Sequence, residues 1–196
     1  MKEIRNIISR GKSYIKFLLS STNQHGVHSP FVYNLTTKCF YDRTQKECYP
    51  LIKSVCRDYS VPFSYKKAKL LHRLISYLGY QKVYLQAKPI AAISKIVSID
   101  NMVSISHSIE SEDTFDLLYL DVDYFKTHHN ALENLLLKTH NDSLIILNTI
   151  NCSKRNDEIW EEIKEHPASR VTIHIFDLGL IFVRKEQAKE HFVIRV

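Results

Sequence analysis

Polar side chains follow two apolar runs of the sequence, and their types suit the binding of cations or polar ligands. Asp121 and Asp123 follow Leu117–Leu120, and Asn148-Thr149 follows Leu144–Leu147. Both runs are typical of strands buried on both faces of a parallel sheet, and ligands bind at the carboxyl ends of such strands. Mg²⁺ prefers oxygen ligands of this kind. Because Asn148-Thr149 brings no negative charge, we expect no metal site here, and we interpret Asp123 as a helix cap.

Two other groups of reactive residues have simpler interpretations. His128-His129 and His140 match no zinc spacing, and adjacent helical residues point in different directions. Cys152 follows a strand end, but few cations near it in sequence would lower the pKa of its thiol. We therefore predict no metal ligand or nucleophile among them.

The loop His25–Val32 stays open as a candidate lining of a site, because loops on a rigid scaffold often carry function. Its Ser29-Pro30 pair is typical of a helix start, with Ser as the N-cap and Pro at the first helical position. A Ser/His catalytic pair is the alternative, but proximity in sequence does not make a triad.

Length and composition favour one globular domain. The chain has 196 residues, 44% of them hydrophobic and 24% charged, which excludes a disordered or collagen-like chain. No apolar run approaches the roughly 18 residues that a membrane span needs, and the first residues show no secretion signal. Four cysteines in this length favour reduced thiols. We therefore expect a cytoplasmic protein.

Charge is distributed unevenly along the chain. Residues 1–73 contain 14 Lys and Arg but only 4 Asp and Glu, whereas residues 74–196 contain 13 and 17. This asymmetry predicts a basic arm that binds nucleic acid or an anionic surface. The alternative interpretation is a solvated helical face on which lysines alternate with apolar residues.

Helical signals dominate residues 1–79, which we predict to form an N-terminal helical arm. Apolar residues recur at helical spacing from Ile4 to Leu19, and further helices are expected after Ser29 and within Leu51–Asp58. A fourth helix begins after Ser64 as its N-cap and ends at Gly79.

Short apolar segments dominate residues 80–196, which we predict to form a mostly parallel α/β sheet. Strands are expected in five segments, and a helix within Phe125–Thr139 makes a βαβ crossover the expected connection between the last two. Asn156-Asp157 is interpreted as the cap of another helix, and Asp177–Gly179 as the turn of a C-terminal antiparallel hairpin. The five expected strands are Val83–Ala87, Ile96–Ile99, Met102–Ser106, Leu117–Leu120 and Leu144–Leu147.

Several stretches resemble a bacterial family of O-methyltransferase-like proteins. They are His25-Gly-Val-His-Ser-Pro-Phe-Val32, Asn141-Asp-Ser143, Trp160-Glu-Glu-Ile-Lys-Glu-His-Pro167 and Arg184-Lys-Glu-Gln-Ala-Lys-Glu-His-Phe192. The resemblance covers both ends of the chain and everything from about Phe115, and it is weak across Lys82–Thr114. It implies a reduced Rossmann-like methyltransferase sheet and a transferase that uses S-adenosylmethionine.

The same resemblance implies two cofactor-binding residues. Asp121 matches the family's aspartate after the corresponding strand, and Asp100, closing the expected strand Ile96–Ile99, matches the carboxylate that binds the ribose hydroxyls. The alternative for Asp100 is a turn-forming residue beside Asn101. No catalytic residue and no metal ligand are assigned.

The first strand departs from the family's pattern, in which a Gly-rich loop lets the backbone approach the ligand closely. Here Val83–Ala87 runs into Lys88-Pro89, and no glycine occurs between Tyr80 and Leu178. Only residues 88–114 remain for the adenosine half of the pocket, whereas a single crossover already takes a dozen residues. We therefore expect a truncated cofactor site.

Three functions follow from these features. The first is a pseudoenzyme that binds no cofactor and serves as a binding module for a protein or small molecule. The second is an active S-adenosylmethionine-dependent O-methyltransferase acting on an unknown small molecule. The third is a nucleic-acid or membrane-surface binder that uses residues 1–73, whose affinity would fall steeply with salt.

Overall fold

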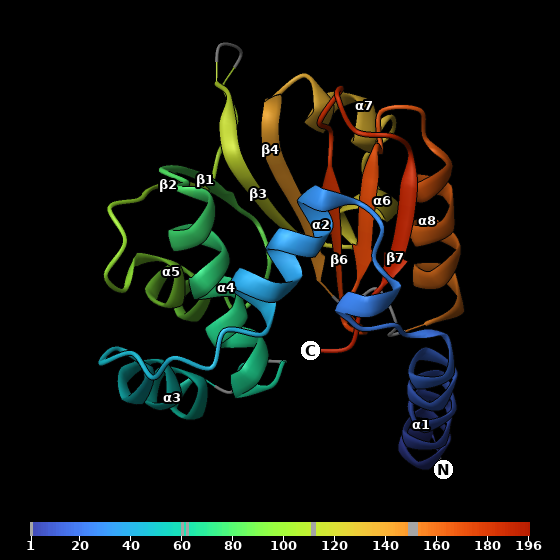
Figure 1. Cartoon of the computed structure of the whole chain (residues 1–196), viewed down its shortest axis with the longest axis horizontal. Helices are drawn as coiled ribbons and strands as arrows, with labels where there is room; N and C mark the ends of the chain where they lie inside the picture. Colours follow the sequence, from blue (N-terminus) through green and yellow to red (C-terminus); the bar gives the residue numbers. More distant parts are fainter. Residues whose placement is uncertain (1, 60, 62, 111–112, 149–152) are drawn as a thin grey trace.

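The protein folds into one seven-stranded sheet with helices on both faces (Figure 1). The computed structural model describes residues 2–59, 61, 63–110, 113–148 and 153–196. The strand order is β2-β1-β3-β4-β6-β5-β7, and every strand runs in the same direction except β6. The strands are β1 (Lys82–Leu85), β2 (Ser104–Ser106), β3 (Phe115–Asp121), β4 (Thr139–Asn148), β5 (Val171–His174), β6 (Leu178–Phe182) and β7 (Glu190–Val193). The predicted α/β class, with a mostly parallel sheet and a C-terminal antiparallel hairpin, is confirmed.

Ten helical segments accompany the strands in the described part of the chain. They are α1 (Lys2–Ser20), η1 (Gln24–Gly26), α2 (Pro30–Leu35), η2 (Thr36–Phe40), α3 (Tyr49–Asp58), α4 (Tyr65–Leu78), α5 (Ile90–Ser98), α6 (Tyr124–Thr127), α7 (Ala131–Leu136) and α8 (Lys154–Glu165). In none of them is the described sequence long and apolar enough to cross a membrane.

Local capping signals place the helix ends where the sequence predicts them. The Ser29 and Ser64 side chains accept hydrogen bonds from the backbone N–H groups of Val32 and Lys67, three residues into α2 and α4. Gly79 ends α4 with φ of 70°, a left-handed conformation that glycine adopts without a side-chain clash. These bonds satisfy helix-end groups that would otherwise lack partners.

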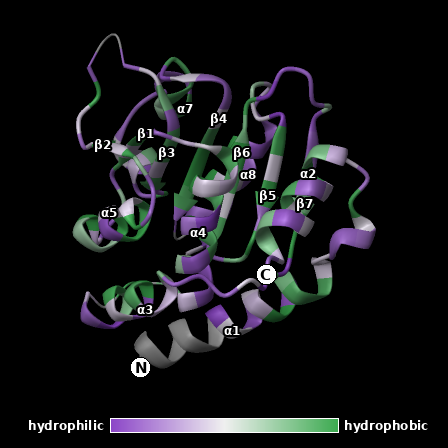
Figure 2. Cartoon of the chain, turned by 60° about the vertical axis from the view of Figure 1, so that its left-hand side comes forward, coloured by the Kyte–Doolittle hydropathy of each residue, from purple (hydrophilic) through white to green (hydrophobic). Residues whose placement is uncertain are grey.

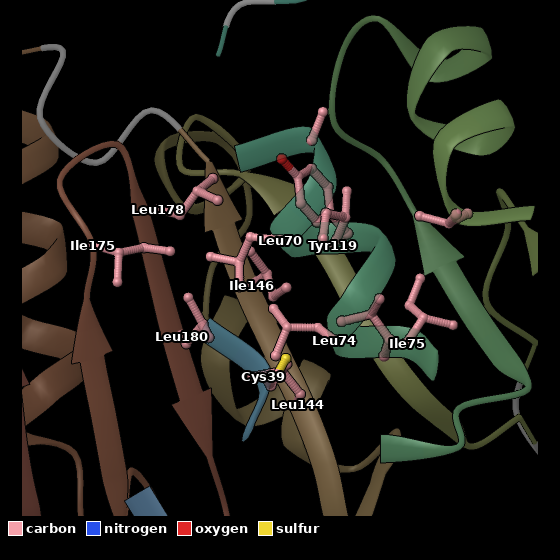
Figure 3. Packing of buried hydrophobic residues seen from close by; sticks show 14 of the residues in the cluster. Cys39, Leu70, Leu74, Ile75, Tyr119, Leu144, Ile146, Ile175, Leu178 and Leu180 are labelled. Carbon is pink, nitrogen blue, oxygen red and sulfur yellow. The ribbon is translucent and has the colours of Figure 1, made fainter. Parts of the chain in front are cut away.

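Helix α4 covers one face of the sheet. Leu70 and Leu74 of α4 lie against Leu144 and Ile146 of β4 and Leu180 of β6 (Figure 3), and all five side chains are at most 1% exposed. Helices α2, α3 and α5 contribute to the same hydrophobic cluster. The helices of the N-terminal half therefore share one core with the strands.

The other face is covered by α7 and α8. Alternate residues of β3 and β4, among them Leu118 and Ile145, pack there with Leu135 of α7 and with Ile159 and Trp160 of α8. The two faces of each central strand are thus both buried, which explains their continuous apolar sequences. Figure 2 shows the hydrophobic colouring concentrated on the central strands.

Three sequence predictions about elements are wrong. Ile96–Ile99 is not a strand, because residues 90–98 form α5, whose Ile93, Ile96 and Val97 are fully buried. Asn156-Asp157 does not cap α8; Ser153 does, by accepting a hydrogen bond from the N–H of Asn156. Asp123 precedes α6 but makes no side-chain capping bond.

Strand β7 is an element that the hydrophobic pattern does not predict. Glu190–Val193 pairs with β5 in parallel, although the segment is polar at its start and only partly buried. Its place is fixed by the open edge of β5, a long-range contact that no local pattern indicates.

Candidate functional site

The carboxyl ends of β1, β3 and β4 meet at Asp121, the aspartate for which a ligand-binding role is expected. Asp121 lies directly opposite Asn148 in the parallel register of β3 and β4. Its Oδ1 accepts a hydrogen bond from the Asn148 side-chain amide at 2.9 Å, and its Oδ2 accepts one from the backbone N–H of Lys88 at 2.9 Å. Both carboxylate oxygens thus bind groups of the protein itself.

The surroundings of Asp121 disfavour the ionised form of its carboxyl group. Burial raises the pKa of the Asp121 carboxyl, and the neighbouring Asp123 carboxylate adds to the rise, against the opposing hydrogen bonds from Lys88 and Asn148. Asn148 itself is only 1% exposed. A carboxylate that is already bonded at both oxygens and disfavoured as an anion is a poor ligand for Mg²⁺.

The loop after β1 is folded down onto the neighbouring strands. Gln86 donates its backbone N–H to the Tyr119 carbonyl of β3 at 2.9 Å, and Ala87 is fully buried. The N–H of Lys88 then turns toward Asp121, and Pro89 has no N–H at all. Helix α5 begins at Ile90 without a side-chain cap. The backbone N–H groups of Gln86 and Lys88 are therefore used internally, and Pro89 has none.

The end of β2 carries no carboxylate. The strand ends at Ser106, and the Nδ1 atom of the next residue, His107, lies 3.0 Å from the Leu85 carbonyl at the end of β1. In the predicted site this position would hold the ribose-binding acid. An exposed histidine occupies the crevice between the two strand ends instead.

Asp100 lies far from this edge in the topology. It occupies the connection between α5 and β2, at the amino end of β2, with φ of 53°. The argument for its role assumed a strand at Ile96–Ile99, and that assumption is wrong because the segment is helical. Asp100 therefore lies near the amino ends of the parallel strands, whereas Asp121 lies at their carboxyl ends.

The interval before β3 is short, as the spacing predicts. Its described residues form one helix, α5, and one strand, β2, which is the edge of the sheet. A wider sheet on this side would need a second crossover of about a dozen residues or more. The wall that would flank the adenine on the far side of β2 is not formed by the described residues.

Beyond β4, the same edge is closed by ion pairs. Asp177, in the turn between β5 and β6, pairs with Lys67 of α4 and with Arg10 of α1, the latter at 2.7 Å. Both cations also lie over the ring of Phe176, at 5.5 Å for Arg10 and 5.3 Å for Lys67. These contacts join α1 and α4 to the carboxyl edge of the sheet.

The other sequence candidates do not join a common site. Asp123 pairs with Lys126 at 2.6 Å, and His128 stacks on Tyr124 with ring centroids 4.0 Å apart. His140 lies at the opposite edge, 2.9 Å from Asp116. The Ser29 hydroxyl is used as the cap of α2. Thr149 and Cys152 lie outside the described residues.

Two features escaped the sequence analysis. Cys48, His72 and Asp100 bring a thiol, an imidazole and a carboxylate within 4.8 Å of one another, and in the described part of the chain no other group of three such ligands does so. The hydroxyl of Tyr119 is buried without a hydrogen-bond partner among the described residues, beside Leu70 (Figure 3). Spacings of 24 and 28 residues match no motif, so no sequence signal could have found the first group.

Comparison with known proteins assigns the fold. No family model and no curated protein matches the chain. A structure from Staphylococcus aureus, named as a caffeoyl-CoA O-methyltransferase, matches with a TM-score of 0.51 at 11% identity, covering 78% of this chain and 97% of its own. A methyltransferase from Geobacter sulfurreducens (TM-score 0.49, 12% identity, 82% and 98% covered) and an SAH-bound methyltransferase from Podospora anserina (0.49, 10%, 80% and 96%) are also similar. The likeness to the Staphylococcus aureus structure shows that the chain has the Rossmann-like fold of O-methyltransferases.

Proposed function

We propose that this protein is a methyltransferase-fold binding module that does not bind S-adenosylmethionine. The observation that carries the proposal is the double engagement of Asp121, whose oxygens accept hydrogen bonds from Lys88 and Asn148. A ligand that used this carboxylate would have to break both contacts and reopen the loop after β1. That cost comes on top of the ordering cost of any binding event.

The remaining parts of a cofactor site do not compensate. The methionine end of the cofactor needs close backbone approach, and the loop at Ala87–Pro89 offers no glycine. The ribose needs a carboxylate at the end of β2, where Ser106 and His107 stand. Each of the three contacts is thus blocked or missing within the described residues.

An active S-adenosylmethionine-dependent O-methyltransferase is the second candidate. The fold favours it, and the similar structures include a methyltransferase solved with SAH and the O-methyltransferase TomG from Streptomyces achromogenes solved with SAM. Asp121 stands at the edge of the sheet where such a ligand would bind. The two candidates differ in one measurable property, which is affinity for the cofactor.

Titration calorimetry with S-adenosylmethionine and S-adenosylhomocysteine separates them. We expect the full-length chain to give no binding heat at physiological ligand concentrations, with a cofactor-binding methyltransferase as the positive control. Low-micromolar binding that is lost in Asp121→Ala but kept in Asp123→Ala would overturn the proposal and establish the enzyme.

The partner best suited to the module is anionic. A hollow of about 840 Å³ lies between the C-terminal residues and parts of the basic N-terminal half. It contains one acidic side chain, Asp42, and five basic ones: Arg43, Lys66, Lys69, Arg73 and Arg195. The Lys69 ammonium also lies 4.8 Å from the ring centroids of both Tyr49 and Tyr65, which fixes its position. The side chains that line the hollow thus make a locally basic concave surface.

Binding of a fluorescently labelled single-stranded oligonucleotide, followed by anisotropy at several salt concentrations, tests this partner. We expect affinity to fall as salt rises, and the double change Lys66→Glu with Lys69→Glu to weaken binding by about tenfold or more. The pair Lys154→Glu with Lys185→Glu changes net charge equally outside the hollow and serves as the control. If both double variants lose the same affinity for the oligonucleotide, binding depends on net charge and not on the hollow.

A further inference from the structure

Three helices on one face of the sheet bring together side chains that no local motif connects. Helices α3, α4 and α5 lie side by side in Figure 1 and contact one another. Cys48 precedes α3, His72 lies in the middle of α4, and Asp100 follows α5. Their thiol, imidazole and carboxylate atoms all lie within 4.8 Å of one another.

The distances suit a tetrahedral ion. The Cys48 Sγ atom lies 3.7 Å from Nε2 of His72. Zinc bonds of about 2.3 Å to sulfur and about 2.0 Å to nitrogen, at a tetrahedral angle, separate the two ligand atoms by about 3.5 Å. The two side chains thus already stand at the separation that one shared ion requires.

Two residues of the cluster are buried and the third is exposed. Cys48 is 7% exposed and His72 is 1% exposed, whereas Asp100 lies at the surface. Asp100 has φ of 53°, and aspartate is one of the few residues other than glycine that tolerates this conformation. Asp100 is thus the one residue of the cluster that lies at the surface.

Without an ion the cluster is poorly matched. Burial raises the pKa of the Cys48 thiol and the nearby Asp100 carboxylate raises it further, while burial lowers the pKa of His72. Nε2 of His72 lies 2.8 Å from the Ile99 carbonyl, and Nδ1 is buried without a partner among the described residues.

We propose that Cys48, His72 and Asp100 bind one Zn²⁺ ion, with the Ile99 carbonyl oxygen or a water molecule as the fourth ligand. Thiolate and imidazole favour Zn²⁺ over Mg²⁺ and Ca²⁺, which prefer oxygen ligands alone. A thiolate and a carboxylate balance the two positive charges of the ion. On binding, the thiol proton leaves to solvent and the ring proton of His72 resides on Nδ1, because Nε2 becomes the ligand atom.

The proposed ion would hold together three helices that pack over the sheet. It is separate from the carboxyl edge, so it does not depend on the proposed function. Lys46 lies close enough to the cluster to lower the pKa of His72, and its charge opposes a cation. We therefore expect a site of moderate affinity, loaded from solution, rather than one that the fold requires.

Cobalt and zinc titrations of the metal-free full-length chain test the site. One equivalent of Co²⁺ is expected to produce a thiolate-to-metal charge-transfer band and the visible bands of tetrahedral coordination. Zn²⁺ is expected to displace the cobalt, and competition with a chromogenic chelator then gives its affinity. The thiolate band should disappear in Cys48→Ser and persist in Cys56→Ser, a matched change within α3 that lies outside the cluster.

Asp100→Asn provides a variant that leaves the buried residues unchanged. We expect it to weaken zinc binding by about tenfold or more, which is typical of losing a metal-site contact, while Asp113→Asn leaves the affinity unchanged. Absence of a thiolate band in the unmodified chain, a band that survives Cys48→Ser, or unchanged affinity in Asp100→Asn would each overturn the proposal.

Discussion

Asp116 and Asp121 stand near opposite ends of β3, and both hold that strand to the segments flanking β1. At the amino end, Asp116 Oδ2 accepts hydrogen bonds from the backbone N–H groups of Gln81 and Lys82, each at 2.7 Å. At the carboxyl end, Asp121 accepts the N–H of Lys88 at 2.9 Å. One residue type thus makes the same kind of contact at both ends of the strand pair.

The two carboxylates differ in their ionisation. Partial burial disfavours the charge of Asp116, but the N–H groups of Lys82 and Gln81 and the nearby His140 together hold its pKa below the ordinary value. Burial dominates at Asp121 and raises its pKa. The amino end is therefore built around a stable anion, and the carboxyl end around a carboxylate with fewer donors than it needs.

This comparison bears on function. An aspartate at the carboxyl end of a central strand would ordinarily be read as a ligand contact. The equivalent contact at the amino end, where no ligand is expected, shows that tying β1 to β3 is sufficient reason for an aspartate at either position. The presence of Asp121 at this position is therefore not by itself evidence of a ligand contact.

The largest effect is expected from Asp116→Ala. It removes the acceptor of two backbone N–H groups and the partner of His140, so the free energy of unfolding should fall by about 2 kcal/mol, as for hydrogen bonds to a charged group. Urea unfolding measures it. Asp123→Ala, which breaks only the exposed pair with Lys126, is the control and should cost less than about 1 kcal/mol. Equal losses would remove the distinction between a structural and a surface carboxylate.

The opposite pKa directions predict opposite effects of acid. The lowered pKa of Asp116 stabilises the fold above its unfolded value, near about 4, and that stability is lost as pH falls through the folded value. The raised pKa of Asp121 favours folding at low pH, and that contribution is lost as pH rises through the folded value.

Unfolding free energies measured from about pH 6 to about pH 2 in the Asp→Asn variants test these signs. Asp116→Asn should flatten the loss of stability in acid, and Asp121→Asn should steepen it. Changes of the same sign in the two variants would show that the two ends of β3 do not differ in the way described.

A smaller effect is expected from Asp121→Asn at neutral pH. Asparagine retains an oxygen that can accept the N–H of Lys88, and the lost charge is one that burial already disfavours. We expect the free energy of unfolding to fall by no more than about 1 kcal/mol, measured in urea beside Asp116→Asn. A loss larger than that of Asp116→Asn would mean that the carboxyl end depends on the anion after all.

Sequence signals located some helix ends and missed others, and they did not report contacts that depend on tertiary packing. Ser29, Ser64 and Gly79 mark helix ends because capping acts within a few residues. Ile96–Ile99 was assigned wrongly because four residues of mixed polarity cannot distinguish a strand from the last turns of a buried helix. The contacts of Asp121 and the grouping of Cys48 with His72 depend on register and helix packing, which no spacing in the chain reports.

Two tyrosine hydroxyls allow the two ends of β3 to be compared through neutral groups. Their removal is expected to change the free energy of unfolding least. The hydroxyl of Tyr80, just before β1, donates a hydrogen bond to the Asp142 carbonyl at 2.8 Å. The hydroxyl of Tyr119, two residues before Asp121, is buried and has no partner among the described residues. Removing a bonded hydroxyl leaves its acceptor unsatisfied, whereas removing an unbonded one relieves a polar group of its burial cost.

Tyr80→Phe should therefore lower the free energy of unfolding by about 1 kcal/mol, and Tyr119→Phe should leave it unchanged or raise it by up to about 1 kcal/mol. Both substitutions keep the aromatic ring, so the difference between them isolates the hydroxyl group. Thermal unfolding of the two variants under one condition measures it. A clear loss in Tyr119→Phe would reveal a polar partner for that hydroxyl, such as a bound water. The carboxyl edge would then be as well satisfied as the amino edge, and the contrast between the two ends of β3 would rest on the two aspartates alone.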